Sequence, residues 1–164
     1  MTRIPAGTAK ADIGPPDDAL GQYKTELLSD TGRLTQFGAF VEELAPGAAS
    51  SYDHWHASED EMVYILEGEV TLRENGKEHL LRPGDAACWP AGDDTAHCLR
   101  NLSPEPVRYL VIGTRLPQDR VTYPDLKRVL HYDRTTDTRR YTDLSGNPAE
   151  KPFLTRRRNG KSRA

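Results

Sequence analysis

The sequence predicts an all-β fold in which short antiparallel strands form a sandwich or a barrel. Between Leu34 and Thr114, short stretches of alternating apolar and polar residues are separated by turn residues, which is typical of strands and not of helices. The length of 164 residues suits one domain, because such a chain can bury one core but hardly two independent ones. We therefore expect a single β-domain with additional segments at both ends.

The elements follow in order along the chain. Residues 1–32 are rich in Pro, Gly, Asp and Thr and predict an N-terminal arm, with one short helix at residues 19–28. A barrel core is expected over residues 33–116. Its strands are expected at residues 35–44, 51–56, 61–74, 77–81, 86–90, 96–101 and 107–115.

Turn chemistry connects these strands. Asn75-Gly76 tolerates positive φ at both central positions and predicts a tight hairpin between residues 70–74 and 77–81. Two further reversals are expected at Pro83-Gly84-Asp85 and at Pro90-Ala91-Gly92. The result is an antiparallel meander, which must close or double over to protect its edge strands.

The C-terminal part divides into two segments. Residues 117–150 are expected to form an extension, with a hairpin around Asp133–Asp137, that packs on the barrel or on a partner subunit. Residues 151–164 carry six Lys or Arg and no acid, so the net charge of −3 leaves −9 for the rest of the chain. We expect this basic tail to be a disordered, solvated end, and the acidic body argues against nucleic acid as a partner.

Other segments bear on location and redox state. No apolar run approaches the roughly 20 residues that cross a bilayer, and the first residues lack the apolar core of a secretory signal. We therefore expect a cytoplasmic protein without a membrane partner. Cys88 and Cys98 are expected to stay reduced, since two thiols in a cytosolic domain rarely pair.

The segment HWHASEDE, residues 54–61, holds the first candidate metal ligands. On a strand, His54 and His56 point to the same side. The polar residues 57–60 suit a turn, after which Glu61 begins a strand and faces inward with Val63 and Ile65. A carboxylate in an apolar interior needs a positive partner, which a divalent metal held by the two histidines would supply. The alternative is a surface strand with two solvated imidazoles.

The opposite face of the same strand is also apolar. It carries Met62, Tyr64 and Leu66. A strand that is apolar on both faces is expected where a second layer or another subunit covers the outer face. The pattern therefore indicates a homodimer. Tyr64, Trp55 and Trp89 are interpreted as packing residues.

A fourth candidate ligand is His97, which faces inward if Leu99 does. Three neutral imidazoles and one carboxylate suit Fe(II), Mn(II), Ni(II), Cu(II) or Zn(II), with positions left open for a substrate. Cys98 points away from His97, so the two are not expected to form a nucleophile and base. His79 and His131 have no partners in the pattern and are expected to be structural or solvated.

These residues resemble the two motifs of the cupin superfamily. The first motif reads Gly47-x6-His54-x-His56-x4-Glu61-x6-Gly68, and the second reads Gly84-x5-Pro90-x-Gly92-x4-His97-x3-Asn101. One extra residue precedes His54 and two extra residues precede His97. The resemblance covers residues 34–115 and implies a double-stranded β-helix, or jelly-roll barrel, with a metal near one mouth bound by His54, His56, Glu61 and His97. The segment that follows resembles small bacterial cupins.

The resemblance leaves two classes of function open. Cupins include isomerases, dioxygenases, decarboxylases, sugar-binding domains and storage proteins. One hypothesis is a metal-dependent isomerase or dioxygenase that acts on a small polar metabolite. The alternative is a sugar- or carboxylate-binding module without chemistry. The inward residues Val63, Ile65 and Leu99 offer no general base, so no catalytic residue is assigned.

Overall fold

The computed structural model describes residues 3–152 and is almost entirely β-structure. One sheet has six strands in the order β1-β2-β3-β10-β5-β8 and a second has three in the order β7-β6-β9. The six-stranded sheet contains β1 (Lys10–Ile13), β2 (Tyr23–Leu27), β3 (Phe37–Leu44), β10 (Val107–Thr114), β5 (Glu61–Glu67) and β8 (Ala86–Trp89). The three-stranded sheet contains β7 (Lys77–Leu81), β6 (Val70–Glu74) and β9 (His97–Arg100).

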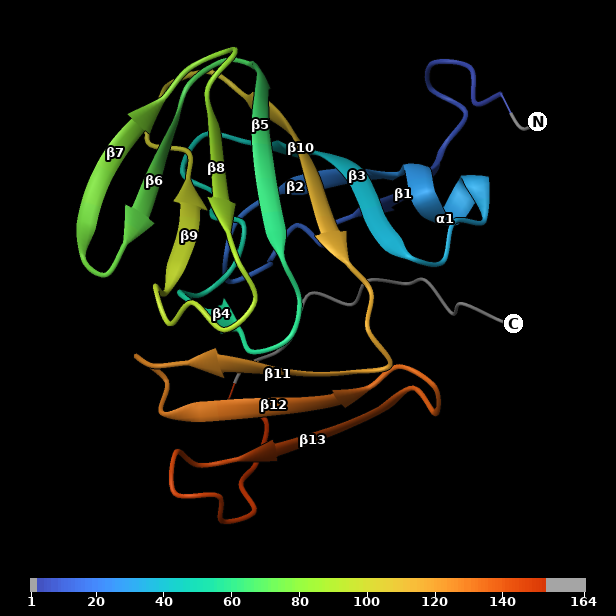
Figure 1. The fold of residues 1–164 in the computed structure, drawn as a ribbon. Helices are drawn as coiled ribbons and strands as arrows, with labels where there is room; N and C mark the ends of the chain where they lie inside the picture. The colour runs from blue at the N-terminus through green and yellow to red at the C-terminus, as the bar shows by residue number, and fades with distance from the viewer. Residues whose placement is uncertain (1–2, 153–164) are drawn as a thin grey trace.

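The two sheets share one hydrophobic core. Its fully buried members include Leu44 of β3, Ile65 of β5 and Val107 of β10, and Val70 and Leu99 join them from the smaller sheet. Alternation explains this, because the buried residues of β5 and β10 are two positions apart and the residues between them are more exposed. Figure 1 shows the three-stranded sheet to the left of β8 and β5, with β10 and β3 to the right of β5. The sheets are not closed into one continuous barrel.

The N-terminal segment extends the larger sheet. The helix expected at residues 19–28 is wrong, because β2 occupies Tyr23–Leu27 and pairs with both β1 and β3. Tyr23, Thr25 and Leu27 are buried and alternate with more exposed residues, which is a strand period. The one helix of the described residues, α1 (Leu28–Gly32), follows directly.

Tight turns set the register of the smaller sheet. The hairpin predicted at Asn75-Gly76 is confirmed: β6 and β7 pair with Glu74 opposite Lys77, and both turn residues have positive φ, 45° and 78°. The segment 61–74, expected as one strand, is instead two strands separated at Gly68. Gly68 has a φ of 75° and lies against the chain at Pro106.

Gly68→Ala is expected to destabilise the fold by about 2 to 5 kcal/mol, since a left-handed conformation and a steric overlap add together. A Cβ atom at this position would lie 2.6 Å from the carbonyl oxygen of Pro106, which is backbone and cannot rotate away. Urea denaturation of both proteins measures the difference. Gly84→Ala is the matched control, because Gly84 also has positive φ but nothing lies within 4 Å of its added Cβ. Equal losses in the two variants would contradict the steric argument.

The C-terminal segment forms a third sheet at one end of the molecule. Its order is β13-β12-β11-β4, and it contains β13 (Thr138–Thr142), β12 (Arg128–Asp133), β11 (Gln118–Tyr123) and β4 (Trp55–His56). The expected hairpin around Asp133–Asp137 is confirmed by the pairing of β12 with β13. In Figure 1 these strands, in orange, form a layer next to β4. Residues 153–164 of the predicted basic tail lie outside the described part of the chain.

Within residues 3–152, no helix combines the length and the apolar character needed to cross a membrane.

Candidate functional site

Local pairing brings the first two histidines to the end of the barrel core. His54 forms an isolated bridge to His97 of β9, and His56 lies in β4, which pairs with β11. The ring centroids of His54 lie 5.1 Å from those of both His56 and His97. The imidazoles of His54 and His56 therefore lie on one side, as strand alternation predicts, and the imidazole of His97 lies beside them.

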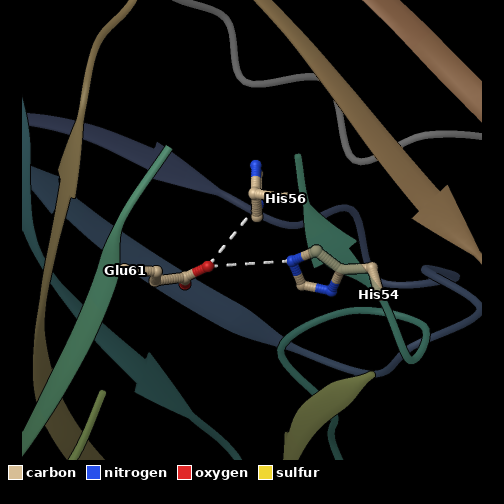
Figure 2. A group of neighbouring side chains, drawn as sticks. All are labelled: His54, His56 and Glu61. Atoms are coloured by element: carbon tan, nitrogen blue, oxygen red, sulfur yellow. Dashed lines mark ion pairs between the residues drawn. The ribbon is translucent and has the colours of Figure 1, made fainter. Parts of the chain in front are cut away.

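Glu61 lies at the centre of this group. It begins β5, and its Oε2 atom lies 3.5 Å from Nε2 of His56, 3.6 Å from Nε2 of His97 and 3.9 Å from Nε2 of His54. Figure 2 shows Glu61 reaching toward His54 and His56 from the neighbouring strand. Three imidazole nitrogens thus face one carboxylate oxygen.

The other ring nitrogen of each histidine contacts a carbonyl or carboxylate oxygen, which accepts a hydrogen bond, and Nδ1 of His54 also lies 3.0 Å from the hydroxyl of Ser51, which can accept as well. Nδ1 of His54 lies 3.0 Å from the carbonyl of Tyr52, and Nδ1 of His97 lies 3.0 Å from the carbonyl of Thr95. Nδ1 of His56 lies 2.6 Å from the carboxylate of Asp119. Each Nδ1 therefore carries a hydrogen and donates it. In a neutral ring this leaves the lone pair on Nε2, directed at Glu61.

Burial and charge set the ionisation of these groups. Burial lowers the pKa of His54 to about 3, although the negative charge of Glu61 opposes the shift. Burial also works to raise the pKa of Glu61, but the three histidines outweigh it and lower that pKa to about 2. Near neutral pH, Glu61 is therefore a carboxylate and His54 is a neutral ring.

His97 is the most enclosed of the four residues. Its side chain is 5% exposed, and its ring stacks on Trp89 at a centroid distance of 3.6 Å and an angle of 6°. Trp89 is itself buried, as the packing interpretation predicted, and its Nε1 donates to Glu74. Among the described residues, Nε2 of His97 is one of two buried side-chain polar atoms without a hydrogen-bond partner. The stack holds the ring in place, while this nitrogen still lacks a partner.

Asp119 is a functional residue that the sequence analysis missed. Its side chain is 2% exposed and accepts hydrogen bonds from Nδ1 of His56 and from the backbone N–H of Ser58. Burial works to lower the pKa of His56, but the hydrogen bond and charge of Asp119, together with Glu61, outweigh it and raise that pKa. Asp119 comes from β11, 63 residues further along the chain. The C-terminal sheet thus contributes to orienting His56.

The chemistry of these atoms fits a divalent metal. The candidate ligand atoms of His54, His56 and Glu61 all lie within 4.8 Å of one another. Two ligands that each lie about 2.1 Å from one ion are separated by roughly 3 to 4 Å, which matches the three contacts of Glu61. A second group, His56, Glu59 and Asp119, fits less well. Its acids already accept hydrogen bonds, Glu59 from Arg134 and Asp119 from His56.

Asp119→Asn is expected to weaken the affinity of the site for a divalent metal by about 10- to 100-fold, the usual cost of losing an outer partner of a metal-binding histidine. The amide cannot replace the anionic acceptor that fixes the Nδ1–H form of His56. Competition with a metal-binding dye measures the affinity. Asp133→Asn serves as the control, since Asp133 lies in the same sheet but hydrogen-bonds only Thr135, Thr136 and Gln118. Equal affinities of wild type and Asp119→Asn would contradict this role.

Cys98 takes no part in the site. The thiol is buried and donates a hydrogen bond to Asp53, and burial together with that carboxylate raises its pKa to about 12. A thiol with so high a pKa stays protonated and is a poor nucleophile. Cys88 is also a free cysteine.

Taken together, these features define a class of protein: a double-stranded β-helix with three histidines and one glutamate gathered at one end. The chain matches the family model described as "Cupin domain" over residues 40–113. It is also similar, at 32% identity, to a solved Silicibacter pomeroyi structure described as a sugar phosphate isomerase from a cupin superfamily. The alignment covers 91% of this chain and 97% of that chain, with a TM-score of 0.83. The chain belongs to the cupin superfamily.

Two other proteins are similar over most of the chain. A solved structure from Acidithiobacillus ferrooxidans, a candidate sugar phosphate isomerase, shares 29% identity over 80% of this chain and 82% of that one, with a TM-score of 0.72. The tetracenomycin polyketide synthase protein TcmJ of Streptomyces glaucescens is 27% identical over 126 residues, which is 76% of this chain and 82% of that protein. The extent of these matches shows that the similarity reaches beyond the barrel core.

Proposed function

We propose that His54, His56, Glu61 and His97 hold one divalent metal ion at which a small polar metabolite binds. The observation that carries this proposal is the direction of the three Nε2 atoms. They face a single carboxylate oxygen at 3.5 to 3.9 Å, while each Nδ1 donates its hydrogen elsewhere. A divalent cation among these four side chains would balance the buried carboxylate and use the three Nε2 lone pairs. Fe, Mn, Ni, Zn and Cu all accept this ligand set.

The reaction that we propose is the isomerisation of a small hydroxy-carbonyl compound, with a sugar phosphate as the first substrate to test. Support comes from the Silicibacter pomeroyi relative, whose alignment spans nearly the whole of both chains. A bound divalent ion would supply polarisation of the substrate oxygens. The chain itself would shield and shape the site, through the ring of Tyr123 stacked on His54 and the buried side chains of Val63 and Leu99.

A second candidate is a binding module without chemistry. It is favoured by the apolar residues that follow the ligands on their own strands. Three of these residues are buried: Val63 and Ile65, which follow Glu61, and Leu99, which follows His97. None of them carries a group that could move a proton. A dioxygenase would use the same metal ligands.

Two measurements test these proposals in sequence. Elemental analysis of protein purified without chelator is expected to give about one divalent metal ion per chain, and absence of metal overturns the proposed site. Incubation of metal-loaded protein with aldose phosphates in D2O, followed by proton NMR, is expected to show ketose formation with deuterium at C1 of the ketose, and loss of the C2 proton from the recovered aldose. Metal-loaded protein that binds the sugar phosphates without exchanging that proton supports the binding module.

We also propose that the protein is a homodimer through the outer face of β3, β10 and β5. On this face Tyr64 and Leu66 are 41% and 38% exposed, and Tyr64 lies opposite Leu110, which lies opposite Val41. Met62 and Ile112 form the next row. A broad apolar face of this kind is typical of a contact surface, and a second copy offers the same face.

Tyr64→Asp is expected to shift the protein from dimer to monomer, because it places a charge at the centre of this apolar face. Light scattering coupled to gel filtration measures the mass. Leu144→Asp is the matched control, since Leu144 is also exposed but lies beyond β13. A wild type that is monomeric at micromolar concentration would refute the dimer.

A further inference from the structure

Three basic side chains form a row across the C-terminal sheet. Arg120 of β11 lies directly opposite His131 of β12, and His131 lies directly opposite Arg140 of β13. Residues opposite one another on neighbouring strands share a face, with Cβ atoms about 5 Å apart. The row therefore concentrates two guanidinium groups and an imidazole on a small area of one face.

This face is the one turned away from the proposed metal. His56 lies opposite Val121 in the pairing of β4 with β11, so Val121 and Asp119 share the face of His56. Arg120 lies between these two residues and points to the other side of the sheet. The row is thus separate from the four residues of the metal site.

The two arginines lack the acidic partners that neighbouring arginines have. Arg134 forms an ion pair with Glu59 and Arg139 with Asp137, both at 2.7 Å. Within residues 3–152, no ion pair or side-chain hydrogen bond engages Arg120 or Arg140. Burial lowers the pKa of His131, and the charges of Arg140 and Arg120 lower it further, so the three groups interact. Two guanidinium groups on either side of one imidazole repel each other, unless an anion lies between them.

A hollow of about 410 Å³ lies over the row. Besides the three basic residues, Ser58, Gln118 and Asp133 are among the residues that line it. The oxygens of Asp133 already accept hydrogen bonds from Thr135, Thr136 and Gln118, and Asp119, which also lines it, is bonded to His56 and Ser58. The hollow therefore presents two guanidinium groups and hydrogen-bond donors to a small ligand, while its two carboxylates, which stay charged, direct oxygens at donors of the protein itself.

We propose that this hollow is an anion site that binds a phosphate group, with Arg120 and Arg140 as its two charged arms and His131 between them. The planar guanidinium group presents paired N–H donors that match the oxygens of phosphate. His131 already contacts Thr142 through Nε2, which leaves Nδ1 for the anion. The ligand is either free phosphate or the phosphate of a small organic ester.

Calorimetric titration of the full-length protein with inorganic phosphate, at constant ionic strength, tests the site. Arg120→Gln and Arg140→Gln are each expected to weaken phosphate binding by about tenfold or more, because each removes charged hydrogen-bond donors. Arg139→Gln is the matched control. It removes the same charge from the same strand but on the other face, and it is expected to change the affinity less than about twofold.

Further measurements of phosphate binding decide the proposal. His54→Ala is expected to leave phosphate binding unchanged, since the row is separate from the metal ligands. Loss of phosphate binding in His54→Ala, or an equal loss in Arg139→Gln and Arg140→Gln, overturns the proposal, as does the absence of binding to the wild type. Glycerol 3-phosphate distinguishes the two sources: tighter binding than inorganic phosphate identifies an ester as the ligand, and equal binding identifies the free anion.

Discussion

His54→Ala is expected to reduce the metal content of the purified protein from about one ion per chain to nearly zero. The affinity should fall by more than the roughly 10- to 100-fold that follows loss of an outer partner, because a direct ligand is removed. Three ligands would remain, and one of them, His97, is fixed by its stack on Trp89 and cannot move to compensate. Elemental analysis after dialysis measures the metal content.

The control for this variant is His79→Ala. His79 lies on β7, its side chain is 52% exposed, and its ion pair is with Glu74 and not with Glu61. His79→Ala also removes one imidazole. If exposed histidines bound the metal nonspecifically, the metal content of both variants would therefore fall. Equal metal content in His54→Ala and wild type would refute the proposed site. Glu61→Gln provides a second measurement, since it keeps the shape of the central side chain and removes its charge.

Much of the site could be predicted because the relevant order is local. Two residues apart on an extended chain, His54 and His56 necessarily share a side. The polar turn before Glu61 allows a new strand to begin at that residue. His97 follows from Leu99, which lies two residues further along the same strand, shares its face and is buried as expected. These inferences required only strand alternation and the cost of burying a charge.

The rest depends on contacts between distant parts of the chain. Asp119 reaches His56 only because β11 pairs with β4, and no local pattern at residue 119 indicates that pairing. Residues 23–27 form a strand and not part of the helix predicted over residues 19–28. Pairing with β3 makes this segment a strand, since the sheet satisfies its backbone and buries Tyr23 and Leu27. Tertiary pairing thus overrides weak local preference.

Asn101 connects β9, which carries His97, to the rest of the barrel. Its side chain is fully buried, and its amide donates to the carbonyls of Leu44 at 2.9 Å and Glu105 at 2.8 Å. The side-chain oxygen accepts from both the N–H and the hydroxyl of Ser103. The asparagine therefore bonds to the end of β3 and also holds together the turn that leads to β10.

Asn101→Ala is expected to lower the free energy of unfolding by about 3 kcal/mol or more, because the buried carbonyl of Leu44 loses the amide donor and the backbone N–H of Ser103 loses its acceptor at once. Asn147→Ala is the control, since Asn147 also hydrogen-bonds within a turn but is exposed, and its loss is expected to be below about 1 kcal/mol. Urea denaturation of metal-free protein measures both, so that lost metal affinity does not add to the result. Similar losses in the two variants would show that the buried bonds of Asn101 contribute no more than surface ones. A large loss in Asn101→Ala alone would mean that the strand carrying His97 depends on this one amide for its attachment to β3.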